Sequence, residues 1–150
     1  MREEIIEFTT IREDFSEYEA ENGQILRAKE AVIEIINRID DGKKKARLKF
    51  SIISNVVTPN PIDTSTLELE TDPNKVTAEY QVKELSFRPL KEIVNIYETK
   101  NAIILLIPIM QKIFLTSKKD ANNAPHLRFS LMSDVSIIEK RLPPPATPNF

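Results

Sequence analysis

The chain has one histidine, His126, and no cysteine, although imidazole and thiolate groups supply many of the general bases, nucleophiles and zinc ligands of enzymes. The polar neighbours of His126 are Asn122, Asn123 and Arg128, which do not make a cluster that binds a metal or transfers a proton. The lack of cysteine also excludes disulfides and thiolate metal sites. We therefore expect no catalytic histidine, no metal site and no cofactor.

Carboxylates and serines are the other side chains that could carry out a reaction. Two carboxylates at a suitable separation can hydrolyse a glycosidic bond, but no pair is singled out. Glu68 and Glu70 share the solvated face of an alternating strand, and Asp40-Asp41-Gly42 lacks the further ligands of a calcium loop. A serine nucleophile needs a base that the chain can barely supply. The serines that recur along the chain are Ser51, Ser54, Ser130 and Ser133. Enzymatic activity stays open but disfavoured, with a carboxylate-dependent hydrolase as one alternative.

Phosphate recognition would depend on basic side chains, because the two glycines of the chain are too few for a glycine-rich phosphate-binding loop. One basic cluster contains Lys43, Lys44, Lys45 and Arg47, and a second, at the equivalent place of the repeat described below, contains Lys118, Lys119 and Arg128. Two such loops on a pseudo-symmetric scaffold could straddle a phosphate backbone. The net charge of -2 gives no overall attraction to nucleic acid. Nucleic-acid binding is therefore an alternative function, weighed against ordinary solvated loops.

The elements that carry these residues recur along the chain. The segment LKFSIISNV at 48–56 reappears as LRFSLMSDV at 127–135, an offset of 79 residues (127 − 48). The same offset pairs Tyr18 with Tyr97 and Phe8 with Phe87. A constant register through turns as well as strands predicts a tandem duplication. We expect a β-rich unit at 1–62, a linking hairpin with a second β-rich unit at 63–142, and an extended Pro-rich tail at 143–150.

Turn residues divide the units into strands. Asn22-Gly23 predicts the tip of a hairpin with positive φ at Gly23, although a capping box at Thr10 and Glu13 leaves a helix over 11–20 as an alternative. The expected antiparallel strands of the first unit are 32–37 and 48–57, joined by a loop at 39–45; those of the second are 113–116 and 127–138, joined by a loop at 117–125. Between the units, 66–70 and 76–85 flank Asp72-Pro73-Asn74, a further hairpin signal.

The segment Glu13-Asp14-Phe15-Ser16-x-Tyr18-x-x-Glu21-Asn22-Gly23 resembles a motif of small prokaryotic proteins, many of them archaeal. The resemblance covers about forty residues and implies a related fold. It brings no activity with it, because none is attached to those proteins. The high isoleucine and lysine content and the absence of cysteine are typical of a thermophile.

One strand is unusually apolar. At the constant offset, Gln24, Arg27, Lys29 and Glu30 of the first unit correspond to Ile103, Leu106, Pro108 and Ile109 of the second. A soluble protein rarely leaves such a surface in water, so the strand is expected to be covered on both faces, either inside the protein or by another subunit. Pro108 favours an edge or a bulge. The predicted interface residues are Ile103, Leu105, Leu106, Ile107 and Ile109.

These patterns predict a mostly β protein, with α+β as an alternative, in which two related units pack as one compact body. The preferred function is a non-enzymatic binding or assembly module, expected to be a homo-oligomer, whose small-molecule ligand, if it has one, the sequence does not identify. The apolar run 102–115 is shorter than the roughly 20 residues of a membrane-spanning helix, and the acidic N-terminus does not look like a signal peptide. No membrane partner and a cytoplasmic location are expected.

Overall fold

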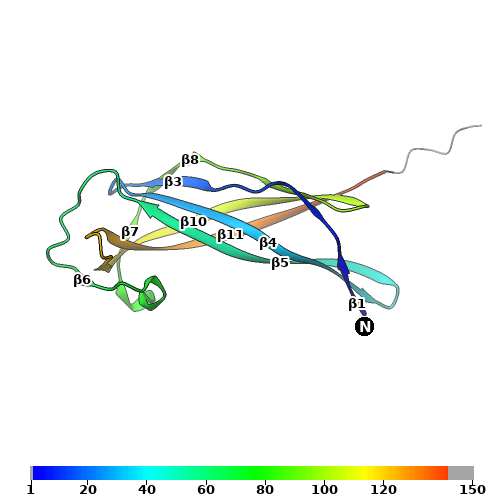
Figure 1. Ribbon diagram of the computed structural model, residues 1–150, viewed down its shortest axis with the longest axis horizontal. Coiled ribbons are helices and arrows are strands. Elements are labelled where there is room, and N and C mark those ends of the chain that lie inside the picture. Colours follow the sequence, from blue (N-terminus) through cyan, green and yellow to red (C-terminus); the bar gives the residue numbers. More distant parts are fainter. Residues whose placement is uncertain (1, 142–150) are drawn as a thin grey trace, which may run out of the picture.

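A computed structural model describes residues 2–141, in which two sheets of mainly antiparallel strands pack face to face (Figure 1). The predicted mostly β class is confirmed. The first sheet contains β1 (Arg2–Ile6), β3 (Ser16–Ala20), β4 (Ile25–Asp40), β5 (Lys43–Val57) and β8 (Phe87–Lys91). The second contains β2 (Thr9–Arg12), β6 (Glu68–Leu69), β7 (Gln81–Leu85), β9 (Asn95–Glu98), β10 (Ala102–Lys119) and β11 (Pro125–Glu139). The predicted Pro-rich tail lies outside the described residues.

Each sheet is built on one long hairpin. β4 pairs with β5 along its whole length, from Ile25 opposite Val57 to Asp40 opposite Lys43. The turn is only Asp41-Gly42, and both residues have positive φ, 49° and 78°, as a tight two-residue hairpin turn requires. The predicted loop at 39–45 is therefore wrong, because the ladder continues through it and places the lysines on a strand. In the second sheet β10 pairs with β11 in the same way, across a longer turn at 120–124.

The remaining strands lie on one side of these hairpins. Because β5 occupies one side of β4, the strands β1 and β3 must share the other side, and β7 and β9 are likewise opposite β11 across β10. On this side the chain crosses between the sheets four times: Glu7-Phe8 connects β1 to β2, residues 13–15 connect β2 to β3, Ser86 connects β7 to β8, and residues 92–94 connect β8 to β9. We call it the closed side. The opposite side, bounded by β5 and β11, is called the open edge.

The order β2, β3, β4, β5 is repeated as β8, β9, β10, β11, with an exchange of strands. β2 of the first half pairs with β9 of the second, while β8 of the second half pairs with β3 of the first. The division into two related units and a common origin of the two halves stay predictions.

The constant offset of 79 residues is wrong beyond the first hairpin turn. Tyr18 stands opposite Leu26, whereas Tyr97 stands opposite Ile104, so the partner strand is offset by 78. The cause is the turn, which has four residues between β3 and β4 but three between β9 and β10. Beyond the next turn the offset becomes 81, because Phe50 opposite Val32 corresponds to Leu131 opposite Met110.

The core consists of two clusters between the sheets. The first contains Tyr18, Ala20, Leu26, Leu85, Met110 and Ile113, and the second contains Val32, Ile35, Tyr97, Ile104 and Leu106. The start of β4 thus packs on the end of β10, and the end of β4 on the start of β10. The two long hairpins therefore run in opposite directions, and their tips lie at opposite ends of an elongated molecule (Figure 1).

The predicted turn at Asn22-Gly23 is confirmed: Gly23 has a φ of 89°, and its N–H donates to the Ala20 carbonyl at 2.9 Å. The helix alternative over 11–20 is wrong, because β2 and β3 occupy most of that range. The predicted hairpin at 66–85 is also wrong. β6 and β7 each pair with β10, and between them lie two 3-10 helices, η1 (Pro73–Lys75) and η2 (Ala78–Tyr80).

Candidate functional site

The motif at 13–23 connects the two halves of the chain through a reciprocal pair of tyrosines. The Tyr97 hydroxyl donates to Glu13 Oε2 at 2.6 Å, and the Tyr18 hydroxyl donates to Glu92 Oε2 at 3.3 Å. Burial raises the pKa of both tyrosines, and the neighbouring carboxylates raise it further, so both stay protonated donors. These buried phenols hold the halves together and do not face a substrate cavity.

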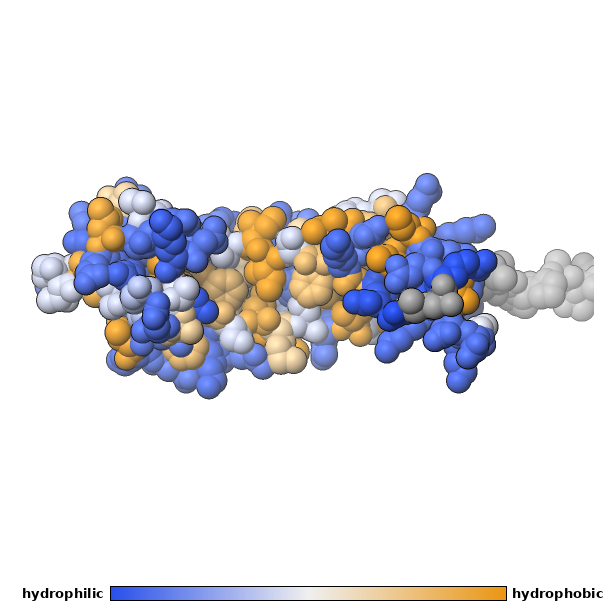
Figure 2. Space-filling view, turned by 90° about the horizontal axis from the view of Figure 1, so that it is seen from below, coloured by the Kyte–Doolittle hydropathy of each residue, from blue (hydrophilic) through white to orange (hydrophobic). Residues whose placement is uncertain are grey.

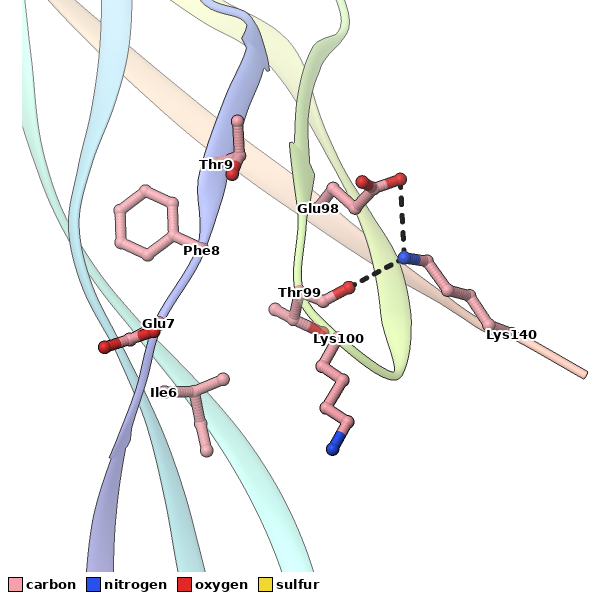
Figure 3. Close-up of a pocket in the computed structure, with 8 residues that line it drawn as sticks. All are labelled: Ile6, Glu7, Phe8, Thr9, Glu98, Thr99, Lys100 and Lys140. Atoms are coloured by element: carbon pink, nitrogen blue, oxygen red, sulfur yellow. Dashed lines mark hydrogen bonds and ion pairs between the residues drawn. The ribbon is translucent and has the colours of Figure 1, made fainter. Parts of the chain in front are cut away.

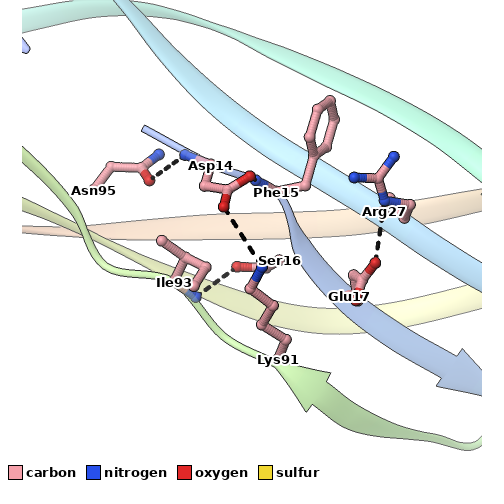
Figure 4. Close-up of polar contacts among 8 residues, drawn as sticks. All are labelled: Asp14, Phe15, Ser16, Glu17, Arg27, Lys91, Ile93 and Asn95. Atoms are coloured by element: carbon pink, nitrogen blue, oxygen red, sulfur yellow. Dashed lines mark hydrogen bonds and ion pairs between the residues drawn. The ribbon is translucent and has the colours of Figure 1, made fainter. Parts of the chain in front are cut away.

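The same exchange is repeated one step along the chain (Figure 4). The Asp14 N–H donates to Asn95 Oδ1 at 3.1 Å, and the Ile93 N–H donates to Ser16 Oγ at 2.9 Å. These bonds satisfy backbone groups where the strands of the closed side change partners. Further along the motif, Glu21 Oε1 accepts from the Ser86 N–H at 2.9 Å. The contacts of the motif at 13–23 therefore close the sandwich on this side.

Glu30 is a buried carboxyl in the middle of β4, only 3% exposed. Glu30 lies between the segment of β4 that pairs with β3 and the segment that pairs with β1, so here β4 pairs with β5 alone. The backbone carbonyl of Glu30 accepts a hydrogen bond from Asn95 Nδ2 at 2.9 Å instead. The side chain accepts a hydrogen bond from the Ser133 hydroxyl of β11. Burial raises the pKa of Glu30 to about 7. At the 78-residue offset its counterpart is Pro108, so this polar group is present in one half only.

The predicted nucleic-acid contacts are divided between the two ends of the molecule. Lys43, Lys44, Lys45 and Arg47 lie near the tip of the β4–β5 hairpin, and Lys118, Lys119 and Arg128 lie near the tip of the β10–β11 hairpin. Because the tips are at opposite ends, the two clusters do not form one basic surface. Two of these residues also have internal contacts: Lys118 pairs with Glu68 at 2.5 Å, and Arg128 donates to the Val76 carbonyl at 2.7 Å.

His126 has a structural environment. Its Nε2 atom is 2.6 Å from the Glu70 carbonyl oxygen, and its own carbonyl accepts from the Thr116 hydroxyl at 2.7 Å. Across residues 2–141, no group of three or more histidine, aspartate or glutamate side chains is arranged to hold a metal ion. Nor does any helix in that range have the length and apolar character needed to cross a membrane.

Two open depressions lie where the chain crosses between the sheets. The larger, about 560 Å³, is lined by Ile6, Glu7, Phe8, Thr9, Glu98, Thr99, Lys100 and Lys140 (Figure 3). The other, about 290 Å³, is lined by Glu19, Ala20, Glu21, Gly23, Ser86, Phe87 and Arg88. In the larger one Lys140 Nζ is held by Glu98 at 3.4 Å and by the Thr99 carbonyl at 2.9 Å. Neither lining contains a histidine, and the contact between Glu21 and Ser86 in the second one is made by the Ser86 backbone N–H.

The open edge is the surface that the other contacts do not explain. Its strands expose nine large apolar side chains, five on β5 and four on β11, each 37–53% exposed. They are Phe50, Ile52, Ile53, Val56, Val57, Met132, Val135, Ile137 and Ile138. β5 runs along the lower side of the molecule in Figure 1, and the view from below in Figure 2 shows apolar side chains gathered in the middle between charged ends.

These side chains project from both faces of the edge strands. Phe50, Ile52 and Val56 stand opposite Val32, Glu30 and Leu26 of β4, so they share the inner face that forms the core. Val135 and Ile137 on β11 stand opposite Leu106 and Ile104 and likewise face inward. The core therefore continues to the open edge, where the described part of the chain leaves it half uncovered.

The predicted interface strand is divided between the two faces of its sheet. Leu106 is 1% exposed inside the sandwich, so it needs no subunit to cover it. Ile103, Leu105 and Ile107 are half-buried and Ile109 is 41% exposed, on the opposite face. Pro108 lies at 107–112, where β10 pairs with β11 alone, and its missing N–H is therefore tolerated.

Sequence reasoning did not find the nine side chains of the open edge. Their signal was present, since 50–57 contains no charged residue and alternates poorly between polar and apolar, but that pattern also fits a buried strand. Comparison with protein-family models, with curated proteins and with solved structures gives no match to this chain.

Proposed function

We propose that the protein is a non-enzymatic binding and assembly module whose binding surface is the open edge. The observation that carries the proposal is the uncovered core between β5 and β11. Taking about 150 Å² as the surface of a large apolar side chain, the nine side chains at 37–53% exposure leave roughly 600 Å² of apolar surface in water. The largest apolar patch of an ordinary monomer is about 300–600 Å² and is often functional.

The backbone of β5 supports the same function. Every residue from Lys49 to Val57 is exposed, and no strand in the described structure pairs with the outer edge of β5. Soluble proteins protect such edges with lysine, proline or bulges. Residues 43–49 carry five basic side chains, whereas 50–57 carry no charge and no proline. The protection is thus missing from the half of β5 that also exposes the apolar side chains.

A labelled peptide with the sequence of Phe50–Val57 tests this function. It can extend the sheet by pairing with a free edge, as β-strand addition does in other binding modules. Fluorescence anisotropy should show saturable binding to the protein. Ile53→Lys, on the open edge, should weaken binding at least about tenfold, which corresponds to about 1.4 kcal/mol.

The matched control is Ile11→Lys, because Ile11 is 56% exposed on β2 of the closed side. This variant should bind the peptide as the unmodified protein does. No saturable binding, or equal weakening by both substitutions, would contradict the assignment of the open edge as the binding surface.

A further inference from the structure

We infer that the open edge is covered by a second copy of the chain, with the β5 strands of the two copies paired antiparallel and centred on Ile53. This inference rests on the proposed function and names its partner. Such a dimer covers the exposed apolar side chains on both faces of β5 and β11, and it keeps the basic segments of the two β5 strands apart.

The paired edges favour a second copy over a single extended segment. β5 and β11 belong to different sheets but lie on the same side of the sandwich, and stacked sheets are about 10 Å apart. One extended strand can pair with one edge only. A second copy related by a two-fold axis perpendicular to the sheets brings its own β5 against β5 and its own β11 towards β11, so both sheets are continued.

The charges on β5 favour antiparallel pairing. In that arrangement the uncharged run 50–57 of one copy lies against the same run of the other, and the basic segments 43–49 extend in opposite directions. Parallel pairing would place ten basic side chains, five from each copy, in two adjacent rows, where like charges repel.

The side-chain faces limit the register to pairings that are centred on a residue. Residues directly opposite in a sheet share a face, and a two-fold axis perpendicular to the sheet keeps each face on its own side. Among these pairings, the one centred on Ile53 lies in the middle of the uncharged run 50–57, and it sets Phe50 opposite Val56 and Ile52 opposite Ser54, all four on the inner face. The roughly 600 Å² of apolar surface approaches the about 800 Å² per partner of a standard interface.

Measurement of molar mass in solution, by light scattering or sedimentation equilibrium, tests the inference. The unmodified chain of 17.2 kDa should have twice that mass. Ile53→Lys places two lysines face to face at the centre of the interface and should have the mass of one chain, as should Ile53→Glu. Both substitutions are at a side chain that is 46% exposed, which the fold of one chain tolerates.

An equal mixture of the two variants should recover the doubled mass, because opposite charges then meet. The control Ile11→Lys should keep it.

The other outcomes are distinguishable. A single-chain mass for the unmodified protein overturns the inference; if the Phe50–Val57 peptide still binds, the proposed function stands with another partner, and if it does not, both fail. A doubled mass that persists in Ile53→Lys shows that the copies meet elsewhere and overturns the inference. Variants that dissociate but do not recover the doubled mass when mixed overturn the pairing centred on Ile53.

Discussion

Glu30 is a buried carboxyl whose ionised form is disfavoured by its surroundings. Its carboxyl lies between the sheets and accepts from Ser133, and burial raises its pKa to about 7 from an ordinary value of 4.5. Between pH 4.5 and pH 7 the Glu30 carboxyl is therefore protonated in the folded protein and ionised in the unfolded chain. Stability is greatest below about pH 4.5 for this group and decreases as the pH rises towards 7, because ionisation inside the protein is unfavourable.

The size of this effect is measurable by denaturant unfolding. At about 1.4 kcal/mol per pKa unit, Glu30 should remove roughly 3 kcal/mol of stability between pH 4.5 and pH 7. Glu30→Gln keeps the shape and can still accept from Ser133, so it should flatten this dependence and be more stable than the unmodified protein at pH 8. The pKa of Asp14 is lowered by the Phe15 N–H and then by Lys91, and the pKa of Glu68 is lowered by Lys118, so these carboxyls contribute in the opposite sense below pH 4.5. Equal pH profiles in the two proteins would show that Glu30 is not the source.

Single residues were predictable from sequence where the chemistry is local. Gly23 adopts positive φ because a tight turn demands it, and Asn22 accepts from the Gln24 N–H at 3.1 Å within the same turn. The partners of Glu13 and Ser16 were not predictable, because they lie 84 and 77 residues away. Such contacts depend on which strands the two halves exchange.

At the scale of elements, a change of one residue in a turn decides which side chains correspond. The shorter turn before β10 means that Leu106 is equivalent to Ala28, and both are buried. An ungapped comparison instead sets Leu106 against Arg27, on the opposite face. The contrast between a polar first strand and an apolar second strand at that position was therefore an effect of register, since a shift of one residue exchanges the two faces of a strand.

The two faces of β10 provide a matched prediction. Leu106→Arg buries a charge in the core and should destabilise the fold by roughly 4 kcal/mol or more, a large part of the 5–15 kcal/mol of an ordinary domain. Ile109→Arg, on the same strand but 41% exposed, should change stability much less. Circular dichroism during thermal unfolding distinguishes them. A folded Leu106→Arg protein with an unchanged melting temperature would contradict the placement of Leu106 in the core.

At the scale of the whole molecule, the sandwich is closed on one side and open on the other. The mostly β class follows from strand-forming residues and turn signals, which a sequence displays directly. The crossings between the sheets do not, because the segments that make them, such as Glu7-Phe8 and Ser86, look like ordinary short connections. Without them, neither the closed side nor the position of β5 and β11 on the same side could be inferred.

Amide hydrogen exchange, compared between dilute and concentrated protein and with added Phe50–Val57 peptide, tests the open edge as the binding surface most directly. Association there should slow exchange over 50–57 of β5 and 132–138 of β11, because their outward N–H groups gain partners or lose solvent. The closed-side strands β2 and β8 should exchange at the same rate throughout. Slower exchange confined to the closed side or to the basic hairpin tips, or no change at 50–57 and 132–138 under any of these conditions, would contradict the account.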